Sequence, residues 1–196
     1  MSPSVVAIGT SWGGLGALIR ILSDLPKQFP APVIIVQHRS KDSDNLLVQL
    51  LQDTSDLNVR EAEDKDVLLA SHVYVAPADY HLLVEGEQLA LTTDEPVRYS
   101  RPSIDVTFSS VAESYGSGAI GVVLTGANDD GSRGLTHILA LGGRGLVQEP
   151  ESAEVPIMPA AAKRAVPAAQ ILPLHEIASR LVEMVSGSVH SNRKAG

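Results

Sequence analysis

Residues 5–13 read Val-Val-Ala-Ile-Gly-Thr-Ser-Trp-Gly, and this stretch decides the fold. The apolar run at 5–8 predicts a buried strand, and the helix-like run Leu-Gly-Ala-Leu-Ile follows at 15–19. Ser11 therefore lies on a sharp turn from a strand into a helix. In this G-x-S-x-G arrangement, small flanking residues allow a strained backbone that projects the hydroxyl above the sheet, beside the positive end of the helix. Such a position suits a nucleophile.

A second interpretation of the same segment is a glycine loop that holds a phosphate on backbone N–H groups, as in dinucleotide-binding proteins. This segment alone does not separate the two interpretations. The glycines at positions 9, 13, 14 and 16 do not form the G-x-G-x-x-G pattern of that fold. The nucleotide-binding interpretation is therefore weak, and the end of the next strand weakens it further.

The second predicted strand is a β-branched run at residues 33–36, typical of a parallel strand that is buried on both faces. It leads into Gln37 and His38, where a dinucleotide site usually has an acidic residue for the ribose hydroxyls. Because the carboxyl ends of adjacent parallel strands open onto one crevice, we expect His38 to approach Ser11 there. An imidazole beside a serine hydroxyl predicts a general base beside a nucleophile, joined by a hydrogen bond.

A third polar group follows the apolar run at residues 119–124, in the loop Thr-Gly-Ala-Asn-Asp-Asp-Gly at 125–131. Asp129 or Asp130 would lie at the same sheet edge, where a carboxylate completes a Ser-His-Asp relay by fixing the imidazole tautomer. The alternative is structural, because aspartates are common in turns and cap helices, and a helix is predicted to begin near Ser132. Together with the serine and the histidine, the carboxylate is interpreted as catalytic.

Several motifs of the chain occur in the order in which they occur in one known family. They are Gly9-Thr10-Ser11-Trp12-Gly13-Gly14, Val36-Gln37-His38, Val75-Ala76-Pro77, Arg101-Pro102-Ser103-Ile104-Asp105-Val106, Leu124-Thr125-Gly126 with Asp130-Gly131, and Met158-Pro159. In these motifs the chain resembles CheB, the chemotaxis receptor methylesterase, over roughly residues 4 to 185. The resemblance implies that Ser11 is the nucleophile, His38 the general base and Asp130 the triad aspartate.

The resemblance further implies a serine hydrolase that removes methyl esters from glutamate side chains of chemotaxis receptors, with deamidation of receptor glutamines as a second activity. Such an enzyme uses no cofactor, and its partner is the cytoplasmic helical region of the methyl-accepting receptors. The similarity covers only the catalytic half of CheB proteins, because their receiver domain and linker are missing from it. Control by phosphorylation in cis is therefore not expected, and a separate regulatory protein is the alternative.

Neighbours of the three residues are expected to form the substrate pocket. Backbone N–H groups around Trp12 and Ala127 would stabilise the oxyanion. Trp12 either packs under the first helix or forms a wall of the pocket. The segment Arg101-Pro102-Ser103 is interpreted as a helix entry with Ser103 as its cap, and as an alternative Arg101 would attract a carboxylate-rich receptor segment. Met158 lies on an irregular stretch that begins at Gln148, which either reaches the active edge or is only a connection. Trp12 and Ala127 depart from the family pattern, as does Asn128 beside them. An alternative interpretation is therefore a catalytically silent binding or regulatory module of the same fold.

The composition is typical of a compact intracellular enzyme domain. The 196 residues include no cysteine, which excludes disulfides, thiolate catalysis and zinc thiolate sites. The histidines other than His38 lack metal-ligand spacing, so no metal site is expected. The net charge of −8 opposes binding to nucleic acid. No run approaches the roughly 20 apolar residues that span a bilayer, so we expect a cytoplasmic protein without membrane insertion.

Strand-like and helix-like runs alternate, which predicts an α/β three-layer sandwich with a mainly parallel sheet. The helices are expected at residues 14–24, 44–54, 103–115, 131–141 and 174–185, and the strands at 4–8, 33–37, 73–76, 119–124 and 144–148. The segment 81–91 predicts an inserted antiparallel hairpin with a glycine turn. One catalytic domain is expected at 1–185, followed by a disordered tail at 186–196.

Overall fold

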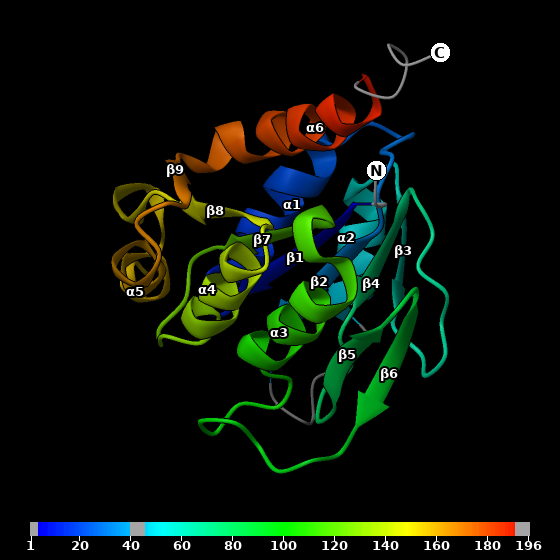
Figure 1. Ribbon diagram of the computed structural model, residues 1–196, viewed down its shortest axis with the longest axis horizontal. Coiled ribbons are helices and arrows are strands. Elements are labelled where there is room, and N and C mark those ends of the chain that lie inside the picture. Colours follow the sequence, from blue (N-terminus) through cyan, green and yellow to red (C-terminus); the bar gives the residue numbers. More distant parts are fainter. Residues whose placement is uncertain (1–3, 40–45, 191–196) are drawn as a thin grey trace.

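A seven-stranded sheet runs through the middle of the molecule in the computed structural model, which describes residues 4–39 and 46–190 (Figure 1). The strand order is β3-β4-β2-β1-β7-β8-β9, and every neighbouring pair is parallel. The strands are β1 (Val5–Thr10), β2 (Val33–Gln37), β3 (Asn58–Glu61), β4 (His72–Val75), β7 (Ala119–Val123), β8 (Arg144–Gln148) and β9 (Gln170–Leu172).

The central strand β1 carries apolar side chains on both faces, as a strand covered by helices on both sides requires. Val6 and Ile8 belong to one core, Val5 and Ala7 to the other, and all four are fully buried. Strand β1 pairs with β2 on one side and with β7 on the other, so the chain turns in opposite directions from the middle of the sheet. Such a reversal opens a crevice at the carboxyl ends of the strands, where ligands of this kind of sheet bind.

Helices cover both faces of the sheet and complete three layers (Figure 1). One core lies between the sheet and the helices α1 (Gly14–Asp24), α2 (Leu46–Thr54) and α6 (Leu174–His190). The other lies between the sheet and the helices α3 (Ile104–Tyr115), α4 (Ser132–Ala140) and α5 (Ile157–Ala165). Two short 3₁₀ helices are η1 (Gly116–Gly118) and η2 (Pro150–Ser152). The predicted three-layer α/β sandwich is confirmed.

The predicted hairpin is also confirmed, as the antiparallel strands β5 (His81–Glu85) and β6 (Gln88–Thr92). Two hydroxyl groups of α3 bind the backbone of β5. Thr107 Oγ1 donates to the carbonyl of Leu82 at 2.7 Å, and Ser110 Oγ accepts from the N–H of Val84 at 2.9 Å. The hairpin is therefore fastened to the helix that begins at the candidate site.

Three observed elements differ from the sequence expectation. Helix α5 occupies part of the stretch that the sequence predicts to be irregular. Pro159 is compatible with this helix because it lies in the first turn, where the missing N–H of a proline breaks no intrahelical hydrogen bond. Strands β3 and β9 are short edge strands with polar residues, so they lack the apolar runs that reveal the central strands.

Helix α6 continues to His190, and residues 186–190 are therefore helical, although the sequence predicts a disordered tail from 186. Buried Leu181 and Val185 anchor the preceding turns, and each further residue adds one hydrogen bond to a helix that already exists. The rest of the predicted tail, and the first two residues of the helix predicted at 44–54, lie outside the described residues. No helix in the described part of the chain is both long and apolar enough to cross a membrane.

Candidate active site

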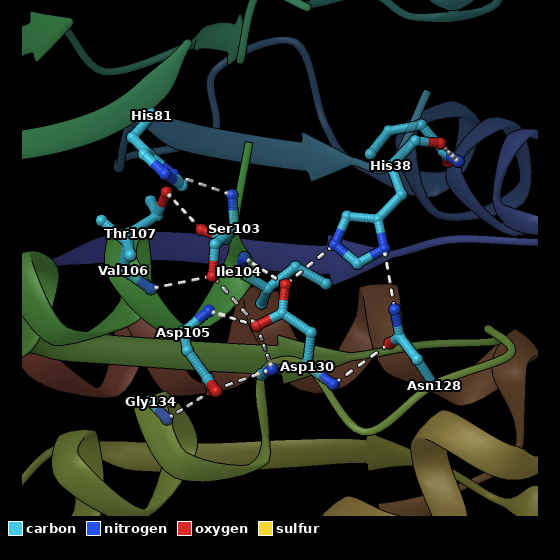
Figure 2. A network of polar contacts seen from close by, with 12 residues as sticks. His38, His81, Ser103, Ile104, Asp105, Val106, Thr107, Asn128, Asp130 and Gly134 are labelled. Atoms are coloured by element: carbon cyan, nitrogen blue, oxygen red, sulfur yellow. Dashed lines mark hydrogen bonds and ion pairs between the residues drawn. The ribbon is translucent and has the colours of Figure 1, made fainter. Parts of the chain in front are cut away.

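His38 and Asp130 meet at the carboxyl edge of the sheet (Figure 2). His38 directly follows β2, and Asp130 lies on the loop between β7 and α4. His38 Nε2 is 2.8 Å from Asp130 Oδ2, and only 3% of the Asp130 side chain is exposed. Asp129 is largely exposed and instead forms an ion pair with Arg98, with 2.6 Å between Oδ2 and Nη1. The carboxylate that faces the histidine is therefore Asp130 and not Asp129.

The carboxylate of Asp130 also caps the start of α3. It accepts hydrogen bonds from the backbone N–H groups of Ile104 at 2.7 Å and Asp105 at 2.9 Å, and from the Ser103 hydroxyl at 3.1 Å. Burial alone would raise the pKa of Asp130, but the hydrogen bond from His38 and the two backbone donors outweigh it and hold the pKa below its usual value. Asp130 thus stays ionised, the state in which a carboxylate orients an imidazole.

Asp105, in the first turn of α3, holds the loop of Asp130 from the other side. Its Oδ1 accepts hydrogen bonds from the N–H groups of Gly131 at 2.9 Å and Gly134 at 2.8 Å, at the start of α4. The pKa of Asp105 is raised, mainly by burial. The hydrogen bond from the Gly134 N–H lowers this pKa, and the nearby charge of Asp130 raises it. The loop after β7 is therefore clamped between the starts of two helices.

Ser11 lies on the turn between β1 and α1. Its backbone N–H donates to the Thr125 carbonyl at 3.0 Å, and its carbonyl accepts from Gln37 Nε2 at 2.8 Å. The same amide donates to the His38 carbonyl at 3.0 Å, so Gln37 ties the loop of Ser11 to the loop of His38. Gly13 has a φ of +77°, a left-handed conformation that favours glycine and closes the turn after the serine.

Two buried threonines hold the strand ends beside Ser11. Thr10 Oγ1 donates to the Thr125 carbonyl at 2.9 Å, and Thr125 Oγ1 donates to the Trp12 carbonyl at 2.9 Å. The N–H of Thr125 donates to Gln148 Oε1, also at 2.9 Å. Because both threonines are shielded from water, these hydrogen bonds fix the turn of Ser11 against the loop after β7.

Gly126 lets buried Met158 pack close to Ser11. A Cβ at position 126 would lie 3.0 Å from the Ser11 Cβ and would overlap the Met158 sulfur. The N–H of Met158 donates to the Gly126 carbonyl at 2.9 Å, and the Met158 side chain is fully buried. Met158, predicted for the substrate pocket, therefore packs behind the serine from α5, where it has no exposed surface.

The expected hydrogen bond between the Ser11 hydroxyl and His38 is not formed. Within the described residues, the imidazole has two side-chain partners: Asp130 at Nε2, and Asn128, whose Nδ2 lies 3.3 Å from His38 Nδ1. The structure thus joins His38 to Asp130 and places Ser11 on the neighbouring loop.

Backbone donors for an oxyanion are available on both loops beside Ser11. In the part of the chain that the structure describes, the N–H groups of Trp12 and Ala127 make no hydrogen bond, whereas those of Ser11 and Gly126 are taken by carbonyl groups. Trp12 is 68% exposed, so its ring is not part of a core, and Ala127 is exposed too. The role of these two N–H groups as donors to an oxyanion stays a prediction.

A cavity of about 320 Å³ opens beside His38. Its lining consists of His38, Arg39, Asp79, Pro96, Tyr99, Ser100, Arg101 and Pro102. Arg101, predicted to attract acidic substrate residues, donates to Asp79 Oδ1 at 2.6 Å and to the carbonyl groups of Thr93 and Asp94. Its guanidinium is therefore engaged in holding the rim of the cavity.

For several residues of the site, the sequence analysis names the position but predicts no role. Asn128 and Asp105 act through contacts that only the folded loops create, and Gln37 differs from an ordinary strand residue only in preceding His38. Ser103 does have a signal, since its place before an apolar segment predicts a cap, and it is the N-cap of α3. No group of three or more His, Cys, Asp or Glu residues within the described ranges could hold a metal ion.

Comparisons with known proteins find one family. The model of the CheB methylesterase family matches residues 6–181. A Leptospira interrogans protein is 40% identical over 185 residues, which cover 94% of this chain and 96% of that protein. A Myxococcus xanthus protein named protein-glutamate methylesterase/protein-glutamine glutaminase 4 is 42% identical, and this chain spans 53% of its length. The crystal structure of the Thermotoga maritima CheB methylesterase catalytic domain is similar with a TM-score of 0.90 and 35% identity, over 94% of this chain and 100% of that one.

Proposed function

The chain belongs to the CheB methylesterase family, and we propose that it is a protein-glutamate methylesterase with Ser11, His38 and Asp130 as its catalytic triad. The observation that carries this proposal is the 2.8 Å contact between His38 Nε2 and Asp130 Oδ2, on a carboxylate that the start of α3 holds in place. A serine on the strand-to-helix turn of the adjacent loop supplies the nucleophile. The reaction is acyl transfer from a glutamyl methyl ester to water.

In the first half of the reaction, the Ser11 oxygen attacks the ester carbonyl carbon while His38 accepts the hydroxyl proton. Because Nε2 donates to Asp130, the proton goes to Nδ1. The carbonyl electron pair moves to oxygen, and the N–H groups of Trp12 and Ala127 stabilise the charge. Collapse of the tetrahedral intermediate breaks the bond to the methoxy group, which leaves as methanol with the proton from Nδ1.

In the second half, water replaces methanol. His38 Nδ1 removes a proton from water as the water oxygen attacks the acyl carbon. The bond between the acyl carbon and the Ser11 oxygen then breaks, and Nδ1 returns the proton to that oxygen. The products are a glutamate carboxylate and the free serine hydroxyl. On a glutamine side chain the same steps release ammonia, which gives the protein-glutamine glutaminase activity that is named for the Myxococcus relative.

Exposed apolar side chains at the same edge of the sheet favour a protein segment as the substrate. They lie on loops that follow strands or in the first turns of the helices behind them: Trp12, Leu15, Leu46, Tyr80, Tyr99 and Ile157. Exposed apolar groups that form one patch mark an interaction surface, and a long protein segment would contact more of these side chains than a small ester would. The proposed partners are methyl-accepting chemotaxis receptors, through their cytoplasmic helical region, which places the reaction in the cytoplasm.

Tyr99 in particular is presented to solvent at the rim of the cavity beside His38. Arg98 and Tyr99 both have positive φ angles, +50° and +66°, and form a two-residue turn closed by mutual hydrogen bonds between Val97 and Ser100. Non-glycine residues in this conformation are strained, and such strain persists where the surrounding structure and function require it. The ion pair of Arg98 with Asp129 ties the turn to the loop after β7.

The proposal is tested by methanol release from a methylated receptor fragment, with wild type and Ser11→Ala side by side. Labelling by a fluorophosphonate, followed by peptide mapping, should place the label on Ser11. A silent binding module would bind the fragment without releasing methanol and would not be labelled. Control by a separate regulatory protein stays a prediction, as does the absence of a cofactor.

A further inference from the structure

Asn128 makes two contacts that fix the orientation of its side-chain amide (Figure 2). Its Oδ1 accepts the backbone N–H of Asp130 at 3.1 Å. The amide nitrogen therefore faces the other way, where it lies 3.3 Å from His38 Nδ1. An amide nitrogen only donates, so the histidine nitrogen opposite it must be the acceptor.

The two contacts of the imidazole define its tautomer. Nδ1 carries the lone pair toward Asn128, and Nε2 carries the proton toward Asp130. This is the tautomer that a base acting through Nδ1 needs. However, Nδ1 has a single lone pair in the plane of the ring, and Asn128 already occupies it.

We propose that Asn128 is a positioning residue that selects the reactive tautomer of His38 and competes with the Ser11 hydroxyl for Nδ1. The inference rests on the proposed function of Ser11 and adds a step to it. Before the serine can give up its proton, the amide of Asn128 must leave Nδ1. A protonated Nδ1 would also face an N–H donor, so Asn128 opposes the doubly protonated ring until it moves away.

Among the residues that the structure describes, three arginines near His38 each form an ion pair. Arg39 binds Glu61 at 2.6 Å, Arg101 binds Asp79 at 2.6 Å, and Arg98 binds Asp129 at 2.6 Å. Tyr99 shares the cavity, and Asp105 lies behind Asp130. Within the described residues, Asp130 is the ionised group in contact with the ring. Asn128 is the neutral group in contact with Nδ1, and its N–H favours the unprotonated form of that nitrogen.

Two variants of Asn128 separate this role from a structural one. Asn128→Ala removes the competitor, so kcat/KM on a methylated receptor fragment should rise roughly two- to tenfold, the ratio that corresponds to one net hydrogen bond. Asn128→Asp keeps an oxygen for the Asp130 N–H but turns the donor at Nδ1 into a charged acceptor. The activity at neutral pH should then fall, and the acidic limb of the pH–rate profile should move up by roughly one pH unit or more.

If Asn128 only holds the loop in place, Asn128→Asp should be more active than Asn128→Ala, because only Asn128→Asp preserves the hydrogen bond to the Asp130 backbone. If Asn128→Ala is slower than wild type while Asn128→Asp matches it, the proposal is wrong. Rates of Ser11→Ala at each pH are subtracted as the background of spontaneous ester hydrolysis.

The tautomer is measured separately by ¹⁵N–¹H correlation spectra of the histidine rings, with the His38 signals assigned from a His38→Asn variant. Wild type should show the proton on Nε2, and Asn128→Asp should show a proton on Nδ1. A wild-type ring protonated at Nδ1 would overturn the inference whatever the activity. This measurement needs no turnover, so an inactive wild type contradicts the proposed function and leaves the tautomer result standing.

Discussion

Asp105 and Asp130 hold the helix starts of α3 and α4 in a reciprocal arrangement. Asp105, in α3, accepts hydrogen bonds from the backbone at the start of α4, and Asp130, just before α4, accepts hydrogen bonds from the backbone at the start of α3. The carboxylate that binds His38 is therefore part of the packing between two helices, and its position depends on that packing.

Ser11→Ala and His38→Ala should each lower kcat by at least about 10⁴-fold, because nucleophile and base act as one unit. The double variant should be no slower than the single ones. Asp130→Asn should be less severe, since orientation is the main contribution of the aspartate. Initial rates of methanol release measure all four, and additive losses would contradict a shared step.

Asp130 should contribute stability that depends on pH. Its folded pKa lies below the unfolded value of about 3.9, so the contribution is complete above that value and is lost as the pH falls through the folded pKa. Asp130→Asn should lower the free energy of unfolding by about 1.5–3 kcal/mol at pH 7. Urea unfolding of both proteins should show this difference shrinking below roughly pH 4. A difference that stays constant down to pH 2 would refute the assignment.

Asp105 should affect the pH dependence of stability in the opposite direction to Asp130. Its folded pKa is raised, so its ionised form opposes folding above the folded pKa, and this effect disappears as the pH falls below the unfolded value. Asp105→Asn should therefore lose stability relative to wild type as the pH is lowered from 7 toward 3.5. Asp105→Ala should cost about 2–4 kcal/mol at neutral pH, because two N–H groups at the start of α4 lose their partner. If the free energy of unfolding changes with pH by the same amount in wild type and in Asp105→Asn, the raised pKa of Asp105 is contradicted.

Gly134 and Gly16 form a matched pair of helix glycines. A Cβ at Gly134 would lie 2.5 Å from the Phe108 Cβ and 3.0 Å from the Asp105 carbonyl, so Gly134→Ala should force α3 and α4 apart. A Cβ at Gly16 would meet nothing within 4 Å. Gly16→Ala should therefore raise the free energy of unfolding by about 0.5–1 kcal/mol, whereas Gly134→Ala should lower both stability and kcat. Thermal unfolding and initial rates provide the comparison.

Trp12→Ala and Tyr99→Ala should each raise KM for a receptor fragment several-fold with a smaller change in kcat, because both side chains are exposed beside the site. Turnover of a small methyl ester should change less than turnover of the fragment. Leu141→Ala is the control, since Leu141 is 44% exposed and lies between α4 and β8, at the amino end of the sheet. Equal effects of all three variants would argue against a docking role.

The sequence predicts the parts of this site that local pattern determines. Ser11, His38 and Asp130 stand out because each follows an apolar run, and parallel strands bring such positions to one edge. The contact of Asn128 with His38 could not be predicted, because it depends on how one amide is turned within a folded loop. Arg101 was expected to face acidic substrate residues, but Asp79 of this chain already binds its guanidinium. Side-chain pairing across distant loops is the information that a linear pattern lacks.

The position of β1 between β2 and β7 also sets when this enzyme becomes active during folding. Val5 pairs with Ala119, so the strand that leads to Ser11 finds its second neighbour only after most of the chain has been synthesised. Contacts between segments so far apart form slowly, because a long loop must close first. Helices α1 and α3 can acquire their backbone hydrogen bonds earlier, since those are local. Hydrolytic activity therefore depends on the pairing of distant segments, and a chain whose local helices have formed without the pairing of β1 with β7 is expected to be inactive.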